Sequence, residues 1–222
     1  MVGSDNPTPL GRGGSLMGIL DEIYRIKQKD FTDKLQEATN PSIVYVTDLT
    51  SCSMKRIMRI RYPLLSFRFE PPIILGELVH TGLEKILMDK GWKAEVQVEK
   101  RVNIDGTEYL LKGRADLVKY SQDDESKAEE IVEIKTGRDL PLNAPHEHHA
   151  LQLRIYLDLF GAKKGYLVYI TPERIVEFSV DPEPVDIETL IRETIYNERA
   201  PRYEWECRYC PYRRICPFAK TR

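Results

Sequence analysis

Apolar and polar residues alternate along the stretch from residue 95 to residue 104. A period of two is typical of a strand with one buried and one solvated face. The dipeptide Asp105-Gly106 follows directly, and this pair favours a two-residue hairpin turn. The pattern therefore predicts a β-hairpin whose second strand runs from about residue 107 to residue 120. Shorter apolar segments predict further strands, at residues 43–46, 131–135, 165–170 and 174–180.

Elsewhere apolar residues recur at helical spacing. Five helices are expected, over residues 16–38, from Thr47 or Thr50 through Cys52 to about residue 61, and over residues 71–90, 145–160 and 185–197. The third should end at Gly91 and bury the stripe Leu75, Val79, Leu83 and Ile86 or Leu87. The order helix, hairpin, strand, helix, strand, strand indicates an α/β fold with a mixed sheet and helices at both ends of the chain.

Composition narrows the class of protein. Of 222 residues, 41% are hydrophobic, which is enough for a core, and the net charge of −2 excludes a globally basic nucleic-acid binder. Residues 1–15 are rich in Gly, Pro, Ser and Asn, so we expect a disordered arm or an expression leader there and a single domain over residues 16–222. No apolar run approaches the length of a membrane span and no signal peptide is visible, which favours a cytoplasmic protein without a membrane partner.

The four cysteines are placed as three plus one. Cys207, Cys210 and Cys216 follow a C-x2-C-x5-C pattern, and Cys52 lies far upstream. In a cytoplasmic protein, clustered cysteines are more often metal ligands than disulfides. Four thiolates alone suggest structural zinc, whereas the prolines after Cys210 and Cys216 are typical of iron–sulfur proteins. Either centre would join the two ends of the chain.

Two predicted strands carry acidic residues among apolar neighbours. Asp116 lies in the second strand of the hairpin, and Glu133 lies in the next strand, two residues before Lys135. Glu133 and Lys135 share one face, because side chains alternate along a strand. Two carboxylates that share a divalent cation beside an ammonium group can hydrolyse a phosphodiester. In the alternative interpretation, Glu133 and Lys135 form a surface ion pair and Asp116 begins a turn.

Basic residues gather near both groups of cysteines. The DNA-binding candidates are Lys55, Arg56, Arg59, Tyr209 and Arg213. Arginine interleaved with aromatic residues suits single-stranded DNA, through charge on the backbone and stacking on the bases. The alternative is that the aromatic rings pack around the metal centre and the charges are solvated. The segment His146-Glu147-His148-His149 fails as a zinc-protease motif because Ala150 stands where H-E-x-x-H needs histidine, so we interpret it as a polar helix start.

In this order the motifs resemble the PD-(D/E)-x-K nuclease superfamily, and specifically its RecB-type branch. The resemblance rests on five features: His80 in a helix, Gly113-Arg114-Ala115-Asp116, Glu133-Ile134-Lys135, Gln152 with Tyr156 four residues later, and the four cysteines. It implies a restriction-endonuclease-like fold, with a mixed central sheet flanked by helices. By resemblance, the metal ligands are His80, Asp116, Glu133 and the carbonyl of Ile134.

The same resemblance assigns the remaining roles. Lys135 is the expected catalytic lysine, and Gln152 and Tyr156 would position DNA or that lysine. The cation would be Mg²⁺ or Mn²⁺, and an imidazole ligand tilts the choice towards Mn²⁺.

The cysteines extend the likeness to the iron–sulfur nucleases of this branch. At this length and without a helicase, the chain resembles the CRISPR-associated exonucleases of the Cas-four family over residues 46–218. This implies a [4Fe-4S] cluster, with [2Fe-2S] equally compatible with four thiolates, in a lobe built from residues 47–65 and 200–218. It also implies an exonuclease on single-stranded DNA that processes spacer precursors in CRISPR adaptation, with the CRISPR integrase as partner. The alternatives are a non-catalytic iron–sulfur or zinc-stapled adaptor for the integrase, and an endonuclease of the same fold.

Overall fold

A six-stranded mixed sheet forms the centre of the computed structural model, which describes residues 18–137, 141 and 143–220. The arm expected over residues 1–15 lies outside this range. The strands are β1 (Ile43–Tyr45), β2 (Lys93–Ile104), β3 (Thr107–Tyr120), β4 (Ala128–Thr136), β5 (Lys164–Ile170) and β6 (Ile175–Val180). Their order is β1-β3-β4-β5-β6, with β2 paired to β3 outside this path. β1 is parallel to β3 and β4 to β5, and the other pairs are antiparallel.

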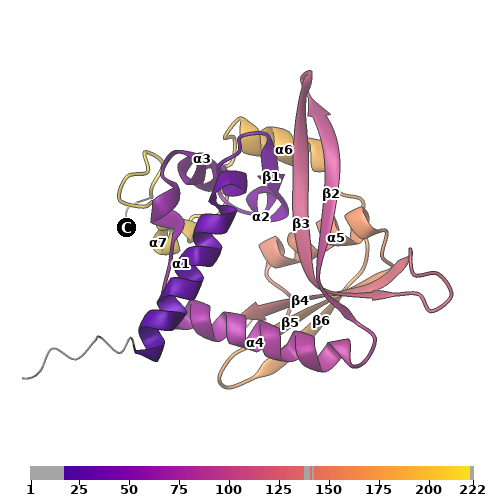
Figure 1. Ribbon diagram of the computed structural model, residues 1–222. Coiled ribbons are helices and arrows are strands. Elements are labelled where there is room, and N and C mark those ends of the chain that lie inside the picture. The colour runs from indigo at the N-terminus through magenta and orange to yellow at the C-terminus, as the bar shows by residue number, and fades with distance from the viewer. Residues whose placement is uncertain (1–17, 138–140, 142, 221–222) are drawn as a thin grey trace, which may run out of the picture.

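The hairpin forms as its turn sequence predicts. Asp105 and Gly106 form the two-residue loop between β2 and β3, with φ angles of 49° and 83°. Positive φ at both central residues is the geometry that such a dipeptide favours. The hairpin is the longest part of the sheet, and it rises at a steep angle from the layer that β4, β5 and β6 form (Figure 1).

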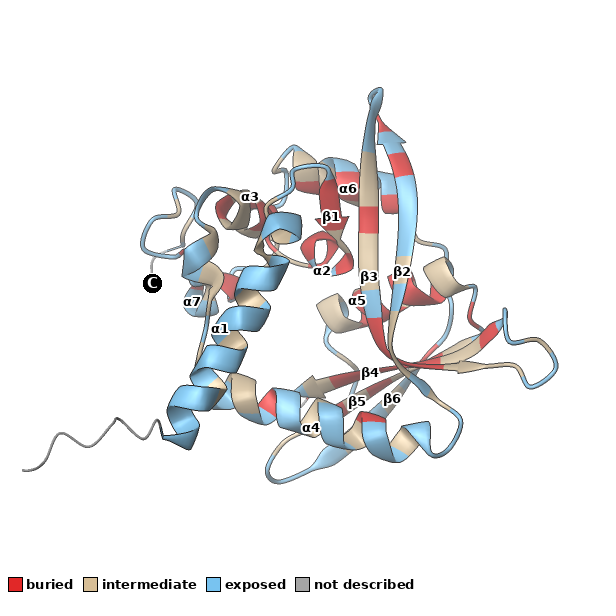
Figure 2. Ribbon diagram, in the orientation of Figure 1, coloured by how far each residue is buried: buried red, intermediate tan, exposed pale blue. Residues whose placement is uncertain are grey.

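Helices cover both faces of the sheet. They are α1 (Ile19–Ala38), α2 (Val46–Leu49), α3 (Ser53–Arg61), a 3-10 turn (Pro63–Ser66), α4 (Pro71–Met88), α5 (Glu147–Phe160), α6 (Ile187–Ile195) and α7 (Glu206–Tyr209). The main core packs α5 and α6 against the sheet, through Leu111, Leu153, Leu167 and Ile191, while α4 packs on a second cluster through Leu83 and Leu87 (Figure 2). No helix within the described ranges is both long and apolar enough to cross a bilayer.

The helix expected to run through Cys52 is interrupted there. α2 ends at Leu49, and Cys52 is the N-cap of α3. The amide of Cys52 donates to Oε1 of Glu206 at 2.9 Å, and the amide of Ser53 donates to the carbonyl of Arg199 at 2.9 Å. These two amides therefore bond to the C-terminal part of the chain instead of to the preceding helical turn.

The predicted apolar stripe of α4 is only half right. Leu75 is 62% exposed and Ile86 is 61% exposed. The buried positions of the helix are Gly76 and Glu84, and it ends at Met88, before the expected position. A Cβ at Gly76 would lie 2.8 Å from Oγ1 of Thr136, so the helix approaches β4 closely on this side. The face that α4 turns towards the sheet is therefore partly polar.

Gly113 lets β3 approach its neighbours. A Cβ on this residue would lie 2.6 Å from Cε1 of Tyr156 and 2.8 Å from Cγ2 of Val46, in both cases too close. We expect Gly113→Ala to lower the free energy of unfolding by about 2 kcal/mol, because the strand or the tyrosine must move. Gly82→Ala is the control, since nothing lies within 4 Å of a Cβ there, and a helical alanine should stabilise by about 0.5–1 kcal/mol. Urea unfolding measures both, and equal effects of the two substitutions would contradict the packing argument.

Candidate active site

β3 and β4 separate beside Asp116. Their backbone pairing ends at Leu117, which lies opposite Val132. One step further, the amide of Ile134 donates a 2.7 Å hydrogen bond to Oδ2 of Asp116. The carboxylate thus replaces a strand partner at the fork where the hairpin leaves the rest of the sheet (Figure 1). The amide of Ile134 makes this contact, and a metal-binding role for its carbonyl stays a prediction.

Glu133 and Lys135 extend from β4 to a polar network with α5. Oε1 of Glu133 accepts hydrogen bonds from Nζ of Lys135 at 2.8 Å and from Nε2 of Gln152 at 2.7 Å. Nζ of Lys135 also donates to Oε1 of Gln152 at 2.9 Å. Burial raises the pKa of Glu133 to about 7, and the charge of Lys135 opposes that rise. The ammonium is therefore held in one position by two partners.

His80 and Glu84 approach Asp116 from α4. Nδ1 of His80 lies 3.5 Å from Oδ2 of Asp116 and 4.0 Å from Oε1 of Glu84. The carboxylate of Asp116 raises the pKa of His80, and burial raises that of Glu84. The sequence analysis gave Glu84 no role. Its position four residues after His80 was the signal that it shares the histidine's side of the helix.

The carboxylates leave oxygen atoms for a cation. Among the described residues, buried atoms Oε2 of Glu133 and Oε1 of Glu84 have no hydrogen-bond partner. A buried anionic oxygen is costly unless a positive charge compensates it. Ligand atoms of His80, Glu84 and Asp116 all lie within 4.8 Å of one another. This oxygen-rich set with one imidazole fits Mg²⁺ or Mn²⁺.

Gln152 and Tyr156 share one face of α5, as their spacing predicts. Gln152 contacts Glu133 and Lys135, whereas the hydroxyl of Tyr156 accepts a 3.3 Å hydrogen bond from the amide of Arg114. Tyr156 is 2% exposed, and burial raises the pKa of its hydroxyl, so it stays neutral. Of the two, Gln152 bonds to the lysine, and Tyr156 bonds to the strand that carries Asp116, while their predicted roles in positioning DNA or the lysine stay predictions.

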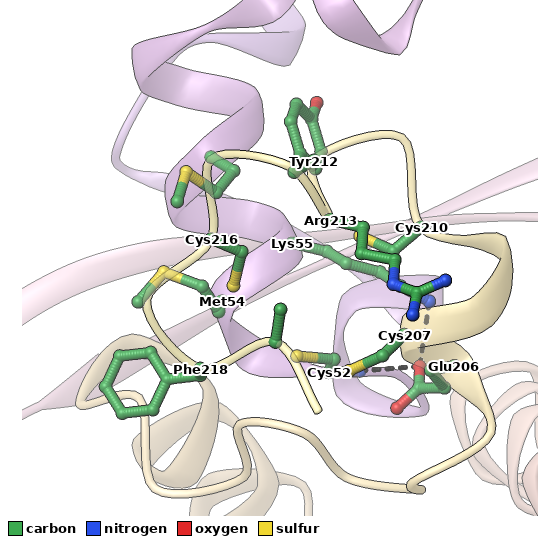
Figure 3. A pocket seen from close by; sticks show the side chains of 12 residues that line it. Cys52, Met54, Lys55, Glu206, Cys207, Cys210, Tyr212, Arg213, Cys216 and Phe218 are labelled. Carbon is green, nitrogen blue, oxygen red and sulfur yellow. Dashed lines mark hydrogen bonds and ion pairs between the residues drawn. The ribbon is translucent and has the colours of Figure 1, made fainter. Parts of the chain in front are cut away.

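The four cysteines line one pocket between the two ends of the chain. Cys52 comes from the start of α3, and Cys207, Cys210 and Cys216 come from α7 and the tail after it (Figure 3). All four are free thiols. The amide of Lys220 donates to Sγ of Cys207 at 3.4 Å, a bond that a thiolate would strengthen. This donor set fits both structural zinc and an iron–sulfur cluster.

Glu206 joins the same two segments independently of any metal. Its Oε1 accepts from the amide of Cys52 at 2.9 Å and from Nζ of Lys55 at 2.8 Å, and its Oε2 accepts from the amide of Tyr203 at 3.0 Å. The residue is 2% exposed. Sequence reasoning missed it, because nothing local distinguishes it from other glutamates of the tail.

Arg56 and Arg59 make their polar contacts within the protein, and the DNA-binding role that we expected for them stays a prediction. Arg56 is 5% exposed, and its guanidinium donates to the carbonyls of Pro41 and Ile43. Arg59 forms a bidentate pair with Asp48, at 2.7 and 2.8 Å. Both side chains point into the protein and hold α3 against β1 and α2. Their spacing on a helix gave no sign of these partners, since all of them lie outside that helix.

The other three DNA-binding candidates lie nearer the surface. Lys55 is paired with Glu206 and 30% exposed, Tyr209 is 61% exposed, and Arg213 is exposed. Lys55 and Arg213 line the cysteine pocket (Figure 3). Their role in DNA binding stays a prediction.

The histidine-rich start of α5 forms an aromatic cluster with the cysteine-rich tail. The ring centroid of His148 lies 5.0 Å from that of Trp205 and 5.6 Å from that of Tyr203. His149 Nδ1 lies 3.0 Å from the hydroxyl of Tyr169. That hydroxyl accepts the amide of His146, so its own hydrogen can be donated to the His149 ring. Burial, with smaller contributions from the charges of His146 and Lys135, lowers the pKa of His148 to about 4. Burial, with a smaller contribution from the charge of Lys135, lowers the pKa of His149 to about 2.

Residues 88–217 match the family model of the PD-(D/E)XK nuclease superfamily. The chain is also 38% identical over 201 residues to the CRISPR-associated exonuclease Cas4 of Saccharolobus solfataricus, and the match covers 87% of this chain and 96% of that protein.

The comparison with solved structures gives a match over most of the chain. The crystal structure of SSO0001 aligns with a TM-score of 0.76 at 37% identity, over 88% of this chain and 98% of that one. An alkaline exonuclease from Laribacter hongkongensis aligns with a TM-score of 0.47 at 11% identity, over 85% of this chain and 100% of that one.

His149 should make the protein less stable in mild acid. The unfolded histidine takes up a proton below pH about 6.5, whereas the folded one stays neutral down to about 2. The contribution of neutral His149 to the free energy of unfolding is therefore fully present well above pH 6.5 and is lost as the pH falls below it. Between pH 7.5 and 5.5 the wild type should lose about 1 kcal/mol more than His149→Gln in urea unfolding. His146→Gln, at an exposed position, is the control, and an equal loss in wild type and His149→Gln would contradict the neutral buried ring.

Proposed function

The chain belongs to the Cas4 family of the PD-(D/E)XK nuclease superfamily, and from this premise we propose a metal-dependent exonuclease that digests single-stranded DNA. The observation that carries the proposal is the convergence of Asp116, Glu133 and Lys135 at the fork between β3 and β4. An adaptor without catalytic activity would not need a half-buried ammonium held between a carboxylate and an amide beside unpaired carboxylate oxygens.

The chain's own groups would act as follows. His80, Asp116 and Glu133, with the carbonyl of Ile134, would hold a divalent cation, which supplies positive charge to the attacked phosphate. Lys135 is 18% exposed at its side chain, so it can reach a phosphate while Glu133 and Gln152 fix its position. Its ammonium would stabilise the negative charge that grows in the transition state. The imidazole of His80 favours Mn²⁺ over Mg²⁺.

For the cysteine pocket we propose a [4Fe-4S] cluster with a structural role. Cys52 and the tail cysteines come from opposite ends of the chain, so a bound cluster would close the loop that contains the nuclease core. Glu206 supports this role, because it ties the same two segments through hydrogen bonds. A [2Fe-2S] cluster would use the same four thiolates.

The proposed DNA path runs along the tail towards Lys135. Tyr209, Trp205 and Arg213 lie exposed on this part of the surface, where aromatic rings can stack on unpaired bases. The half-buried rings of His148 and His149 lie between this surface and the active site, since the charge of Lys135 acts on both. Processing of spacer precursors beside the CRISPR integrase is part of the same proposal and rests on the family alone.

Substitution of the active-site residues tests the chemistry. Asp116→Ala, Glu133→Ala and Lys135→Ala should each lower the cleavage rate by about 10²-fold or more, because each removes charge from the transition state. The assay follows end-labelled single-stranded DNA with Mn²⁺ or Mg²⁺. A circular single strand should resist an exonuclease and be cut by an endonuclease.

Lys163→Ala is the matched control, because this lysine is 76% exposed and lies far from the catalytic network, next to Glu129. It should leave the rate unchanged. Cleavage that survives all three active-site substitutions would remove this site from the reaction and favour the adaptor.

The colour of the protein tests the cysteine centre. Protein purified without oxygen should absorb broadly in the visible range, and Cys52→Ser or Cys216→Ser should weaken that absorption and lower the melting temperature. Lys135→Ala should keep it unchanged. A colourless wild type that contains stoichiometric zinc would contradict the iron–sulfur cluster and identify the centre as structural zinc, because zinc has no visible absorption.

A further inference from the structure

Glu84 is a buried carboxylate to which neither the sequence motifs nor the proposed ligand set gives a role. It is 8% exposed, and Oε1 has no hydrogen-bond partner within the described part of the chain. The nearby guanidinium of Arg114 forms an ion pair with Glu95 instead. A negative charge that is buried and unpaired in this way is destabilising unless something else neutralises it.

The surroundings of Glu84 match the first coordination shell of a small divalent cation. An octahedral ion with bonds of about 2.1 Å places neighbouring ligand atoms about 3.0 Å apart and opposite ones about 4.2 Å apart. Nδ1 of His80 lies 3.5 Å from Oδ2 of Asp116 and 4.0 Å from Oε1 of Glu84. Both separations from His80 lie within that range, and ligand atoms of all three residues lie within 4.8 Å of one another.

We propose that Glu84 is a ligand of the active-site cation, which it binds from α4 together with His80 and Asp116. The inference rests on the proposed function for the identity of the metal and extends the ligand set by one carboxylate. Lys135 and Gln152 occupy Oε1 of Glu133, whereas its Oε2 has no hydrogen-bond partner among the described residues. Buried carboxylate oxygens without a partner therefore come from two elements, α4 and β4.

This arrangement gives α4 a role in catalysis beyond packing. The helix brings two proposed ligands, four residues apart, close to Asp116 of β3. Its exposed neighbour Glu77, three residues before His80, pairs with Lys27. Glu77 is therefore the matched control for Glu84, with the same chemistry on the same helix.

The test compares Mn²⁺ binding by wild type, Glu84→Gln and Glu77→Gln, measured from the electron paramagnetic resonance signal of free Mn²⁺. Glu84→Gln should raise the dissociation constant tenfold or more, and Glu77→Gln should leave it unchanged. Without added metal, Glu84→Gln should melt at the same temperature as wild type or higher, because a buried unpaired charge is gone. The rise in melting temperature that Mn²⁺ causes should shrink.

Nuclease assays distinguish the ligand role of Glu84 from the proposed nuclease activity itself. At saturating Mn²⁺ Glu84→Gln should recover much of the cleavage rate, with the half-maximal Mn²⁺ concentration shifted upwards tenfold or more. If the wild type cleaves DNA but Glu84→Gln binds Mn²⁺ as wild type does, the ligand role of Glu84 is wrong and the nuclease proposal stands. If Mn²⁺ binding depends on Glu84 but the wild type cleaves no DNA, the cation site stands and the nuclease proposal is wrong.

Discussion

The hydrogen bond from the amide of Ile134 to Asp116 is the interaction on which the site depends. Two antiparallel strands normally satisfy their amides with each other, so strands that separate must find other acceptors. Here a carboxylate accepts the amide, and it can do so only at the point where β3 turns away from β4. The same separation opens the space in which Glu133 and Lys135 meet α5. The polar fork is thus a consequence of how the sheet divides.

A second constraint joins the ends of the chain. Glu206 binds the backbone of Cys52 and of Tyr203, which brings the cysteines together and positions the tail against the start of α5. There, Trp205 packs beside His148. Any group bound by the four cysteines would therefore stabilise a wall of the active site as well as the lobe itself. Loss of that group should therefore disturb the network of Glu133, Lys135 and Gln152, even though the two sites share no ligand.

Local sequence patterns predicted the structure correctly where the residues that interact or share a face lie close together in the sequence. The hairpin turn at Asp105, the shared face of Glu133 and Lys135, and the paired spacing of Gln152 and Tyr156 all follow from periodicity. These patterns did not predict the contacts of a side chain whose partners come from segments far away in the sequence. Spacing did not show that Arg59 pairs with Asp48, or that Glu84 is a buried position of α4. Helical spacing says which residues share a face, but not what that face meets.

The central claim is that Asp116 and Glu133 share one divalent cation beside Lys135. Crystals soaked with Mn²⁺ and measured at a wavelength where manganese scatters anomalously would test it most directly. The account predicts an anomalous peak within bonding distance of both carboxylates, next to the fork between β3 and β4. A peak elsewhere, or an occupied site from which Asp116 or Glu133 turns away, would contradict it.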